Sequence, residues 1–433
     1  MMRPELAGPG AGQADERRYD LDWLRVSAFL LLIFYHVGMF FVPWDWHLKN
    51  PRTAGPSLEI PMFLVSRWRL PLLFVVSGAA VHFALRKRSR TEFVRERFSR
   101  LLVPLIFSML VVVPPQVYYE RVAEGAAYTS FLAFLPDAFA GGAYPRGNIS
   151  WHHLWFVAYV FVYALLALPL FHALRSDRGR AVVGRFAAWC QRRPSTLFLF
   201  ALPILASEIA LRPAWPATHN LVADWANFVT YLILFVYGYV LYSDERFGAA
   251  IERRRRAALM LGIAASASLV TIARTGHSPD ETAYDFASLA WIAANALDAG
   301  FWLVALMGYA RRYLNVRSTT IRYANEAVYP FYILHQTVII AIAYHLIDWD
   351  VAIPLKFAVI ATGTFVVTTA LYLAIRTNDV TRVLFGMKRR AAAARASATR
   401  PPAIQATTMR PSPARARPSR APETRVVGPT ATG

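Results

Sequence analysis

The sequence predicts an all-α protein, a polytopic membrane helical bundle of about ten transmembrane helices. The first observation is composition: 56% of the 433 residues are hydrophobic and only 17% are charged, against about 25% charged in soluble domains. The second is that the apolar residues form long runs, most of them near the roughly 20 residues that cross a bilayer as a helix. The third is that the positive charges gather in alternate loops between these runs.

This composition excludes several classes of protein. The single cysteine, Cys190, leaves no internal disulfide framework and no cysteine-built metal cluster. The chain carries 47 Lys and Arg against 27 Asp and Glu, a net charge of +20, but the topology below accounts for this excess. A soluble enzyme, a secreted disulfide scaffold and a nucleic-acid binder are therefore not expected.

Ten apolar runs are candidates to span the membrane. The fifth is short and is interrupted by Pro203 and Glu208. The first is not expected to be a cleavable signal peptide, because acidic residues precede it and no small-residue cleavage site follows it. The predicted spans are 24–42, 61–84, 101–117, 151–172, 196–211, 224–242, 257–272, 286–309, 327–346 and 353–375.

The distribution of Lys and Arg predicts the orientation of these spans. With residue 1 in the cytoplasm, the inside segments carry 37 of them and the outside segments carry 6. This bias is what the positive-inside rule requires of an even number of spans with both termini cytoplasmic. We therefore expect a multi-pass protein of the cell inner (plasma) membrane, in contact with membrane lipids.

The two ends of the chain differ in composition from the middle. Residues 1–18 form a polar tail, and residues 388–433 are rich in Ala, Pro and Arg. A segment of this second kind buries too little apolar surface to offset the entropy of ordering, so we expect a disordered basic C-terminal tail. The transmembrane domain is expected to occupy residues 19–376.

Two ionisable residues in the first span share one helical face. Arg25 and His36 are eleven residues apart, which is three turns plus about 20° and about 16 Å along the axis. Asp22 lies one turn before Arg25 and can pair with it. Alternatively, Arg25 is an interfacial anchor and His36 a hydrogen-bonded core histidine. Ionisable residues within spans otherwise mark substrate paths and functional sites.

The ninth span contains a histidine at a comparable depth. His335 lies about 12 Å from the start of that span, which runs in the same direction as the first. Pro330 is expected to kink the helix or to free a carbonyl group nearby. The alternative is an aromatic packing segment with a buried histidine.

Further arginines lie in the second span and before the third. Arg67 and Arg69 are two residues apart and cannot share a helical face. Arg97 and Arg100 present planar donor groups suited to phosphate, although plain positive-inside charge also explains them. Ser77 precedes a glycine, and tight packing of helices through small residues is the alternative for this site.

The fourth span begins with a segment of histidines and tryptophans. His152, His153 and Trp155 lie there, and interfacial anchoring by aromatic residues is the default explanation. No carboxylate or third ligand stands nearby in the sequence, so no metal site is expected.

Together these motifs resemble the acyltransferase-3 family of integral membrane O-acyltransferases over about residues 19–376. The segment LDWLRVSAFLLLIFYH is similar to the family's first helix, in which an Asp-x-x-Arg overlaps an Arg-x10-His pattern. The other motifs follow in the family's order. The matching residues are Asp22, Arg25 and His36; Phe74 to Gly78; Arg97, Arg100, Leu101 and Pro104; His153 to Phe156; and Tyr329, Pro330, Tyr332, His335 and Gln336.

The resemblance implies a membrane O-acyltransferase. It implies transfer of an acyl group, of the acetyl or succinyl class, from cytoplasmic acyl-CoA to a hydroxyl of an extracytoplasmic glycan or lipid-linked acceptor. The segment PWDWHLKN, Pro43 to Asn50, resembles the branch related to glucan biosynthesis protein C. Acyl-CoA is then a donor substrate, and neither a permanently bound cofactor nor a metal is expected.

On this basis the candidate residues receive roles. His36 is the general base, because a neutral imidazole accepts a proton near pH 7. His335 polarises the thioester or orients the acceptor. Arg25 holds Asp22 in place or contacts the CoA arm. Arg97, Arg100 and Ser77 are assigned to the donor, and Arg67, Arg69, His153, Trp155 and Tyr332 to the acceptor or the acyl group.

Two other classes of protein fit the same composition. A secondary transporter or flippase for an anionic glycan or lipid would also carry intramembrane arginines and histidines. Such proteins often contain paired repeats with broken helices, and no repeat is visible here. The third class is a non-catalytic membrane scaffold in which the histidines are inert.

Overall fold

The computed structural model describes residues 18–276 and 278–390. Apart from Arg18, the predicted N-terminal tail lies outside the described residues, and so does the predicted C-terminal tail beyond residue 390. The described part is helical, with one isolated bridge between Ala143 and Ile149 and no named strand. The prediction of an all-α fold is thus confirmed.

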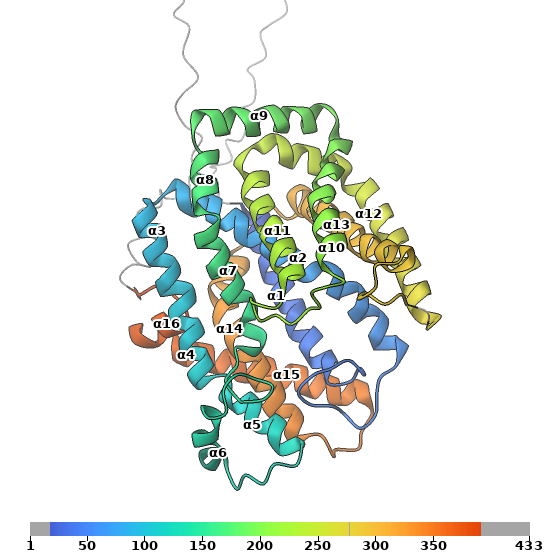
Figure 1. The fold of residues 1–433 in the computed structure, drawn as a ribbon. Coiled ribbons are helices and arrows are strands. Elements are labelled where there is room, and N and C mark those ends of the chain that lie inside the picture. The colour runs from blue at the N-terminus through green and yellow to red at the C-terminus, as the bar shows by residue number, and fades with distance from the viewer. Residues whose placement is uncertain (1–17, 277, 391–433) are drawn as a thin grey trace, which may run out of the picture. The chain divides into compact units, whose positions relative to one another are not determined.

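The helices follow one another along the chain (Figure 1). The first nine elements are α1 (Tyr19–Met39), α2 (Pro56–Arg86), α3 (Arg90–Arg97), the π-helix η1 (Phe98–Leu102), α4 (Val103–Val111), α5 (Pro114–Ala123), α6 (Phe131–Ala138), the 3-10 helix η2 (His152–Leu154) and α7 (Trp155–Leu166). The others are α8 (Leu168–Leu174), α9 (Asp177–Arg192), the 3-10 helix η3 (Pro194–Phe200), α10 (Ala201–Leu211), α11 (Trp225–Ser243), α12 (Glu245–Arg274), α13 (Phe286–Tyr313), α14 (Thr319–His345), α15 (Ile353–Ile375) and α16 (Asp379–Leu384).

The number of spans agrees with the prediction of about ten. In the described residues, nine helical stretches are long and apolar enough to cross a membrane. A tenth is present if η2 and α7 cross together with α8, which is bent from them by 50°. The helix α9, in a predicted cytoplasmic segment, runs across the end of the bundle instead of along it (Figure 1).

The third span begins earlier than its apolar run predicts. The helical stretch starts at Arg90, not at residue 101, because Ser89 and Glu92 form a capping box that satisfies the first backbone N–H groups. The stretch continues through η1 to Ala123. Arg97 and Arg100 therefore lie within a helical stretch, and η1 is a π-helical turn of a kind that often marks functional sites.

The centre of the bundle is closely packed between α2 and α11. A Cβ atom added to Gly78 would overlap the carbonyl oxygen of Phe235, and one added to Gly238 would overlap that of Val75. Small residues let two backbones approach in this way. For Gly78 the packing alternative is therefore the one that the structure shows.

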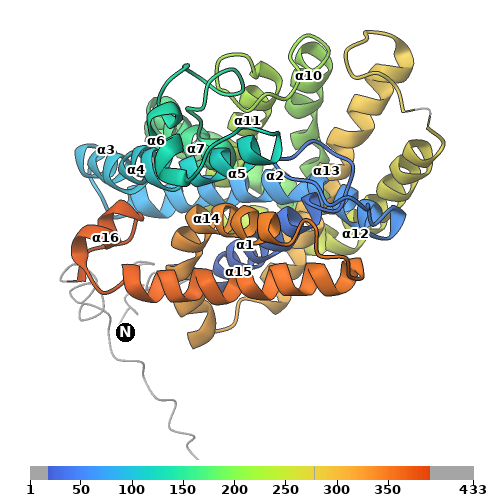
Figure 2. The same ribbon diagram turned by 90° about the horizontal axis from the view of Figure 1, so that it is seen from below.

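The helices α1, α14 and α15 form a second packed group. α14 contacts both α1 and α15, and α15 lies along the outside of the described bundle (Figure 2). Since α1 and α14 carry the two predicted histidines, this contact decides how the histidines lie relative to each other.

Candidate active site

A cavity of about 360 Å³ lies where α1, α2, η2 and α14 meet the loops at one end of the bundle. These loops belong to segments that the charge bias places outside the cell. We call it the histidine cavity. Its polar lining residues include Tyr35, His36, His47, Arg69, Tyr144, Ser150, His152, His153, Thr218, His219 and Gln336.

His36 and His335 form a hydrogen-bonded pair at the base of this cavity. His36 Nδ1 lies 2.7 Å from His335 Nε2. The second nitrogen of His335, Nδ1, lies 2.7 Å from the carbonyl oxygen of Tyr332, and a carbonyl only accepts. His335 Nδ1 therefore carries the proton, His335 Nε2 accepts, and His36 Nδ1 donates. In this neutral tautomer, His36 Nε2 holds the free lone pair.

A clamp between η2 and α14 holds His335 in place. His153 Nε2 lies 3.1 Å from the carbonyl oxygens of both Tyr332 and Ile333, so it donates to them. In return, the Tyr332 hydroxyl donates to the carbonyl oxygen of His153. The rings of His153 and His335 meet edge to face with centroids 5.1 Å apart. The sequence predicted that His153 and Tyr332 contact a substrate. In the structure both lie beside the histidine pair.

Arg69 lies in the same cavity and is 8% exposed. Its guanidinium carbon is 3.3 Å from the centroid of the Tyr35 ring. Its Nε and Nη1 atoms are buried and have no hydrogen-bond partner among the described residues. Apart from Tyr35, no group of the described residues offsets its charge through an ion pair. A buried cation without an ion pair is costly, so this guanidinium is suited to hold an anionic group that enters the cavity.

A network behind the cavity was not foreseen from the sequence. His47 Nδ1 donates to Oε2 of the buried Glu120, and the Tyr144 hydroxyl donates to Glu120 Oε1 at 2.8 Å. Burial, together with this hydrogen bond, raises the pKa of Tyr144 far above its ordinary value, so the phenol keeps its proton. Gln336 Nε2 donates to His47 Nε2 at 3.0 Å and to Gln116 Oε1 at 3.1 Å. Glu120 was not among the predicted site residues because the predicted third span ended at residue 117.

Three residues of this region have the side chains of a metal site. The ligand atoms of His47, Glu120 and His152 lie within 4.8 Å of one another. A carboxylate and a third possible ligand therefore lie near the adjacent histidines in space, although not in sequence, because α5 and the loop after α1 converge on η2. The hydrogen bonds of Glu120 to His47 and Tyr144 already occupy both carboxylate oxygens.

Trp155 and His219 also form part of the wall of the histidine cavity. Their ring centroids are 4.2 Å apart, and the carbonyl of His219 accepts a hydrogen bond from Trp151 Nε1 at 3.0 Å. Burial lowers the pKa of His219, against the opposing effect of Asp224. This imidazole is therefore neutral near pH 7, and the wall offers an aromatic surface with polar edges.

At the other end of α1, Arg25 also contacts α14. Arg25 Nη1 donates to Asn325 Oδ1 at 3.2 Å, and Asn325 Nδ2 donates to Asp22 Oδ1 at 3.0 Å. Arg25 thus contacts Asn325, and His36 contacts His335 ten positions further along α14. Both contacts agree with the prediction that Arg25 and His36 share one face of α1. Asn325 links Asp22 to Arg25.

An apolar cavity of about 170 Å³ lies between α1, α14 and α15 and reaches the histidine pair from the other side. His335 is part of its lining, whereas His36 lines the histidine cavity. The lining of the apolar cavity begins at Val26 and Ala324, the neighbours of Arg25 and Asn325. The pair therefore stands where a polar cavity and an apolar cavity approach each other.

Arg97 and Arg100 lie apart from the histidine cavity. Both pair with Glu96, at 3.0 and 3.4 Å. Arg100 Nε also donates to the carbonyl of Gly386 at 3.2 Å. Their binding of the donor stays a prediction, as does that of Ser77.

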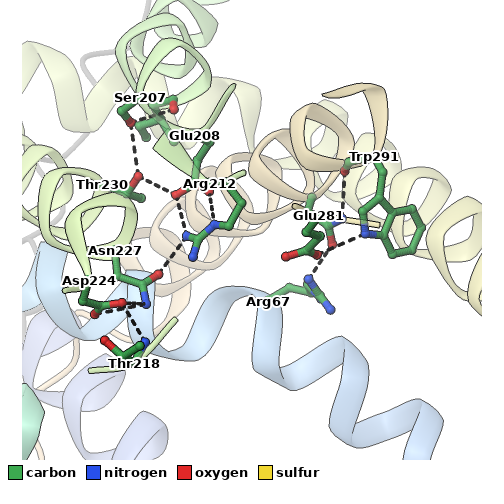
Figure 3. Close-up of polar contacts among 12 residues, drawn as sticks. Arg67, Ser207, Glu208, Arg212, Thr218, Asp224, Asn227, Thr230, Glu281 and Trp291 are labelled. Carbon is green, nitrogen blue, oxygen red and sulfur yellow. Dashed lines mark hydrogen bonds and ion pairs between the residues drawn. The ribbon is translucent and has the colours of Figure 1, made fainter. Parts of the chain in front are cut away.

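Arg67 lines a different cavity from Arg69. This second cavity of about 190 Å³ lies between α2, α10, α11 and α13, and Arg67 shares it with Glu208, Arg212 and Glu281 (Figure 3). The structure thus separates the two arginines that sequence analysis assigned together to a substrate.

Comparison with known proteins identifies the family. A family model described as an acyltransferase domain matches residues 18–375. Curated relatives named Glucans biosynthesis protein C come from Escherichia coli O157:H7 (strain EC4115 / EHEC) and O6:K15:H31 (strain 536 / UPEC). Each is 22% identical over 350 residues, which cover 74% of this chain and 81% of the relative. No solved structure gives a significant match. Because the family match covers most of the chain, this protein belongs to the acyltransferase-3 family and is a multi-pass membrane acyltransferase.

Proposed function

We propose that the protein transfers an acyl group from cytoplasmic acyl-CoA to a hydroxyl of an extracytoplasmic glycan, with His36 as the general base. The observation that carries the proposal is the position of the histidine pair. His36 lines the polar cavity, and His335 lines the apolar cavity on its other side. A thioester and a hydroxyl that enter through different cavities would meet at this pair.

The tautomers of the pair support the role of His36. Its Nε2 lone pair is free to take the hydroxyl proton while the oxygen attacks the thioester carbonyl. Its Nδ1–H stays bonded to His335 Nε2 at 2.7 Å. The imidazolium formed on His36 is then stabilised by an acceptor already in place. When the tetrahedral intermediate collapses, this imidazolium returns its proton to the leaving thiolate of CoA.

Arg69 supplies the positive charge that the reaction needs. Negative charge develops on the thioester oxygen during attack, and a dicarboxylic acyl group such as succinyl carries a further carboxylate. Fixed donors in a site that excludes water stabilise such charge strongly. Arg69 has two nitrogens without a hydrogen-bond partner among the described residues, and they are the donors that we assign to this charge.

In this proposal acyl-CoA enters from the cytoplasmic end of α1. The apolar cavity extends from Val26 and Ala324 to His335, about 16 Å along α14. The pantetheine arm of acyl-CoA is a long chain suited to such a path, and Arg25 stands beside its start. The histidine cavity, on the other side of the pair, is lined by aromatic and polar groups, including Trp155 and His219, which suit a sugar.

Acceptor-dependent release of CoA tests the proposal. We expect the purified full chain to release free CoA from acetyl-CoA or succinyl-CoA when a glucan oligosaccharide is present, and mass spectrometry should show the acylated sugar. A transporter or a scaffold would release none. Failure of every acyl-CoA, with protein shown to be folded and with cell-envelope glycans as acceptors, would contradict the assigned donor.

A further inference from the structure

The second cavity combines two arginines that differ in how their charges are balanced. Arg212 donates twice to the carboxylate of Glu208, at 2.8 and 3.0 Å, and once to Asn227 Oδ1 at 2.8 Å. The Thr230 hydroxyl completes the set with a hydrogen bond to Glu208 Oε1 at 2.6 Å. Figure 3 shows Arg212 held between Glu208 and Asn227. The charge of Arg212 is therefore neutralised where it lies.

Arg67 has no such partner. Its Nη1 donates to the neutral amide of Asn295 at 2.5 Å, and its guanidinium carbon lies 4.1 Å from the centroid of the Phe63 ring. No carboxylate of the described residues forms an ion pair with it, and its Nε is buried without a hydrogen bond. The carboxylates of Glu281 and Asp298 act on its charge from a longer range, without forming an ion pair with it. An arginine in a membrane span that has donor atoms without a partner is suited to an anionic ligand.

An apolar cavity continues from this polar one. It has a volume of about 80 Å³ and is lined by aliphatic and aromatic side chains of η3, α10, α11, α12 and α13, together with Val75. The two cavities share part of their lining, namely Ile204, Leu234, Ala296, Gly300 and Leu303. We call the combined space the arginine cavity.

Gly300 stands at the junction of its two parts. A Cβ atom added to Gly300 would meet no atom within 4 Å, so the space in front of this residue is open. Along α13 the lining runs from Ile292 to Met307, about 22 Å by the helical rise. This length exceeds half of the roughly 30 Å hydrocarbon core.

The lining of the arginine cavity changes from charged to apolar along the direction in which α13 crosses the membrane. Its charged end lies beside Arg212 and Glu281, at the end of the bundle that the charge bias places outside the cell. Its apolar end lies deeper along α13. A lipid of the outer leaflet has the same arrangement, with its anionic headgroup at the outer surface and its hydrocarbon chains deeper in the membrane.

We propose that the arginine cavity binds a phospholipid, with its headgroup phosphate on Arg67 and one acyl chain passing Gly300 into the apolar part. Arginine presents two or more donors to a phosphate and is the side chain best suited to hold one. Basic side chains between transmembrane helices bind lipid headgroups on the cytoplasmic or matrix side of membranes, and we assign Arg67 the same role at the opposite side. The inference is independent of the acyl transfer proposed above, since Tyr231 and Trp155, with ring centroids 5.8 Å apart, stand between the two sites.

Titration of delipidated full-length protein with dioleoylphosphatidylglycerol, followed by native mass spectrometry, tests this site. We expect Arg67→Gln to weaken binding by about tenfold, because a charge-assisted contact is lost. Gly300→Leu is expected to weaken it similarly by filling the junction. The matched controls are Arg52→Gln, which removes an exposed loop arginine, and Ala290→Leu, which places the same Leu side chain on the exposed side of α13. Neither control is expected to change the affinity.

A second arm separates a lipid from a free anion. Glycerol 3-phosphate should not compete with the lipid at equal concentration, because it lacks the chain. If it competed as well as the lipid and Gly300→Leu had no effect, the site would bind only an anion, and the lipid assignment would be overturned. Equal binding by all variants would overturn it as well. If Arg67→Gln failed to fold, as judged by gel filtration, Gly300→Leu against Ala290→Leu would decide.

Discussion

Arg67 and Arg69 are separated by one residue of α2, yet they line different cavities. Arg69 faces the histidine cavity and stacks on Tyr35, whereas Arg67 faces the arginine cavity and contacts Asn295. Positions two apart on a helix point about 200° away from each other. Both guanidinium groups lack an ion pair among the described residues.

The difference lies in what adjoins each arginine. Beside Arg69, the imidazoles of His36 and His153 line the same cavity, and His36 is hydrogen-bonded to His335. Beside Arg67 the space continues past Gly300 into hydrocarbon-like lining. We therefore propose that the same type of side chain takes part in the reaction in one cavity and binds a lipid in the other. The following experiments test this separation.

The largest effect is expected for the histidine pair. His36→Gln removes the free imidazole nitrogen, and we expect acyl transfer to fall by about 10²–10⁴-fold, the usual contribution of general base catalysis. The control is His345→Gln, an exposed histidine of α14 that contacts Tyr119 and Tyr344. Steady-state rates of CoA release measure both. Near wild-type transfer by His36→Gln would place the base elsewhere.

Arg69→Gln should have the next largest effect. A fixed charge in a site that excludes water contributes about 3 kcal/mol, so kcat/KM is expected to fall by about 100-fold. If Arg69 contacts the acyl carboxylate, the loss is greater for succinyl-CoA than for acetyl-CoA. Arg67→Gln is expected to reduce transfer less than Arg69→Gln. The reverse order would show that the arginine cavity, not the histidine cavity, holds the reacting groups.

A smaller effect is expected at the opposite end of the bundle. Replacing Arg97 and Arg100 together by Gln should raise KM for acyl-CoA by about tenfold, the loss of one charge-assisted contact, and change kcat less. Arg88→Gln is the control, since Arg88 also pairs with Glu96, at 3.1 Å. An unchanged KM would leave these arginines as determinants of topology alone.

Removal of metal should have almost no effect. The carboxylate of Glu120 is held by His47 and Tyr144, and the proposed steps use no metal. Dialysis against a chelator is therefore expected to leave the rate within about twofold, less than 0.5 kcal/mol. A large loss that Zn²⁺ restores would instead assign His47, Glu120 and His152 to a metal.

Some of these features were predictable because they depend on helix periodicity and composition. The spans, the shared face of Arg25 and His36, and the comparable depth of His335 follow from spacing along a helix. The pairing of His36 with His335 does not, because it depends on which helices pack together. His47 and Glu120 were missed for a related reason: one lies in a loop and the other past the end of an apolar run. The separation of Arg67 from Arg69 was predicted, but the identity of each cavity was not.

Transfer across a sealed membrane tests the central claim most directly. Inside-out vesicles containing the full chain would receive labelled acyl-CoA outside, on the cytoplasmic face, with a glucan oligosaccharide trapped in the lumen. We predict that the trapped sugar becomes acylated with wild-type protein and remains unmodified with His36→Gln. Acylation that occurs only when donor and sugar share one compartment would contradict the meeting of two cavities at the histidine pair.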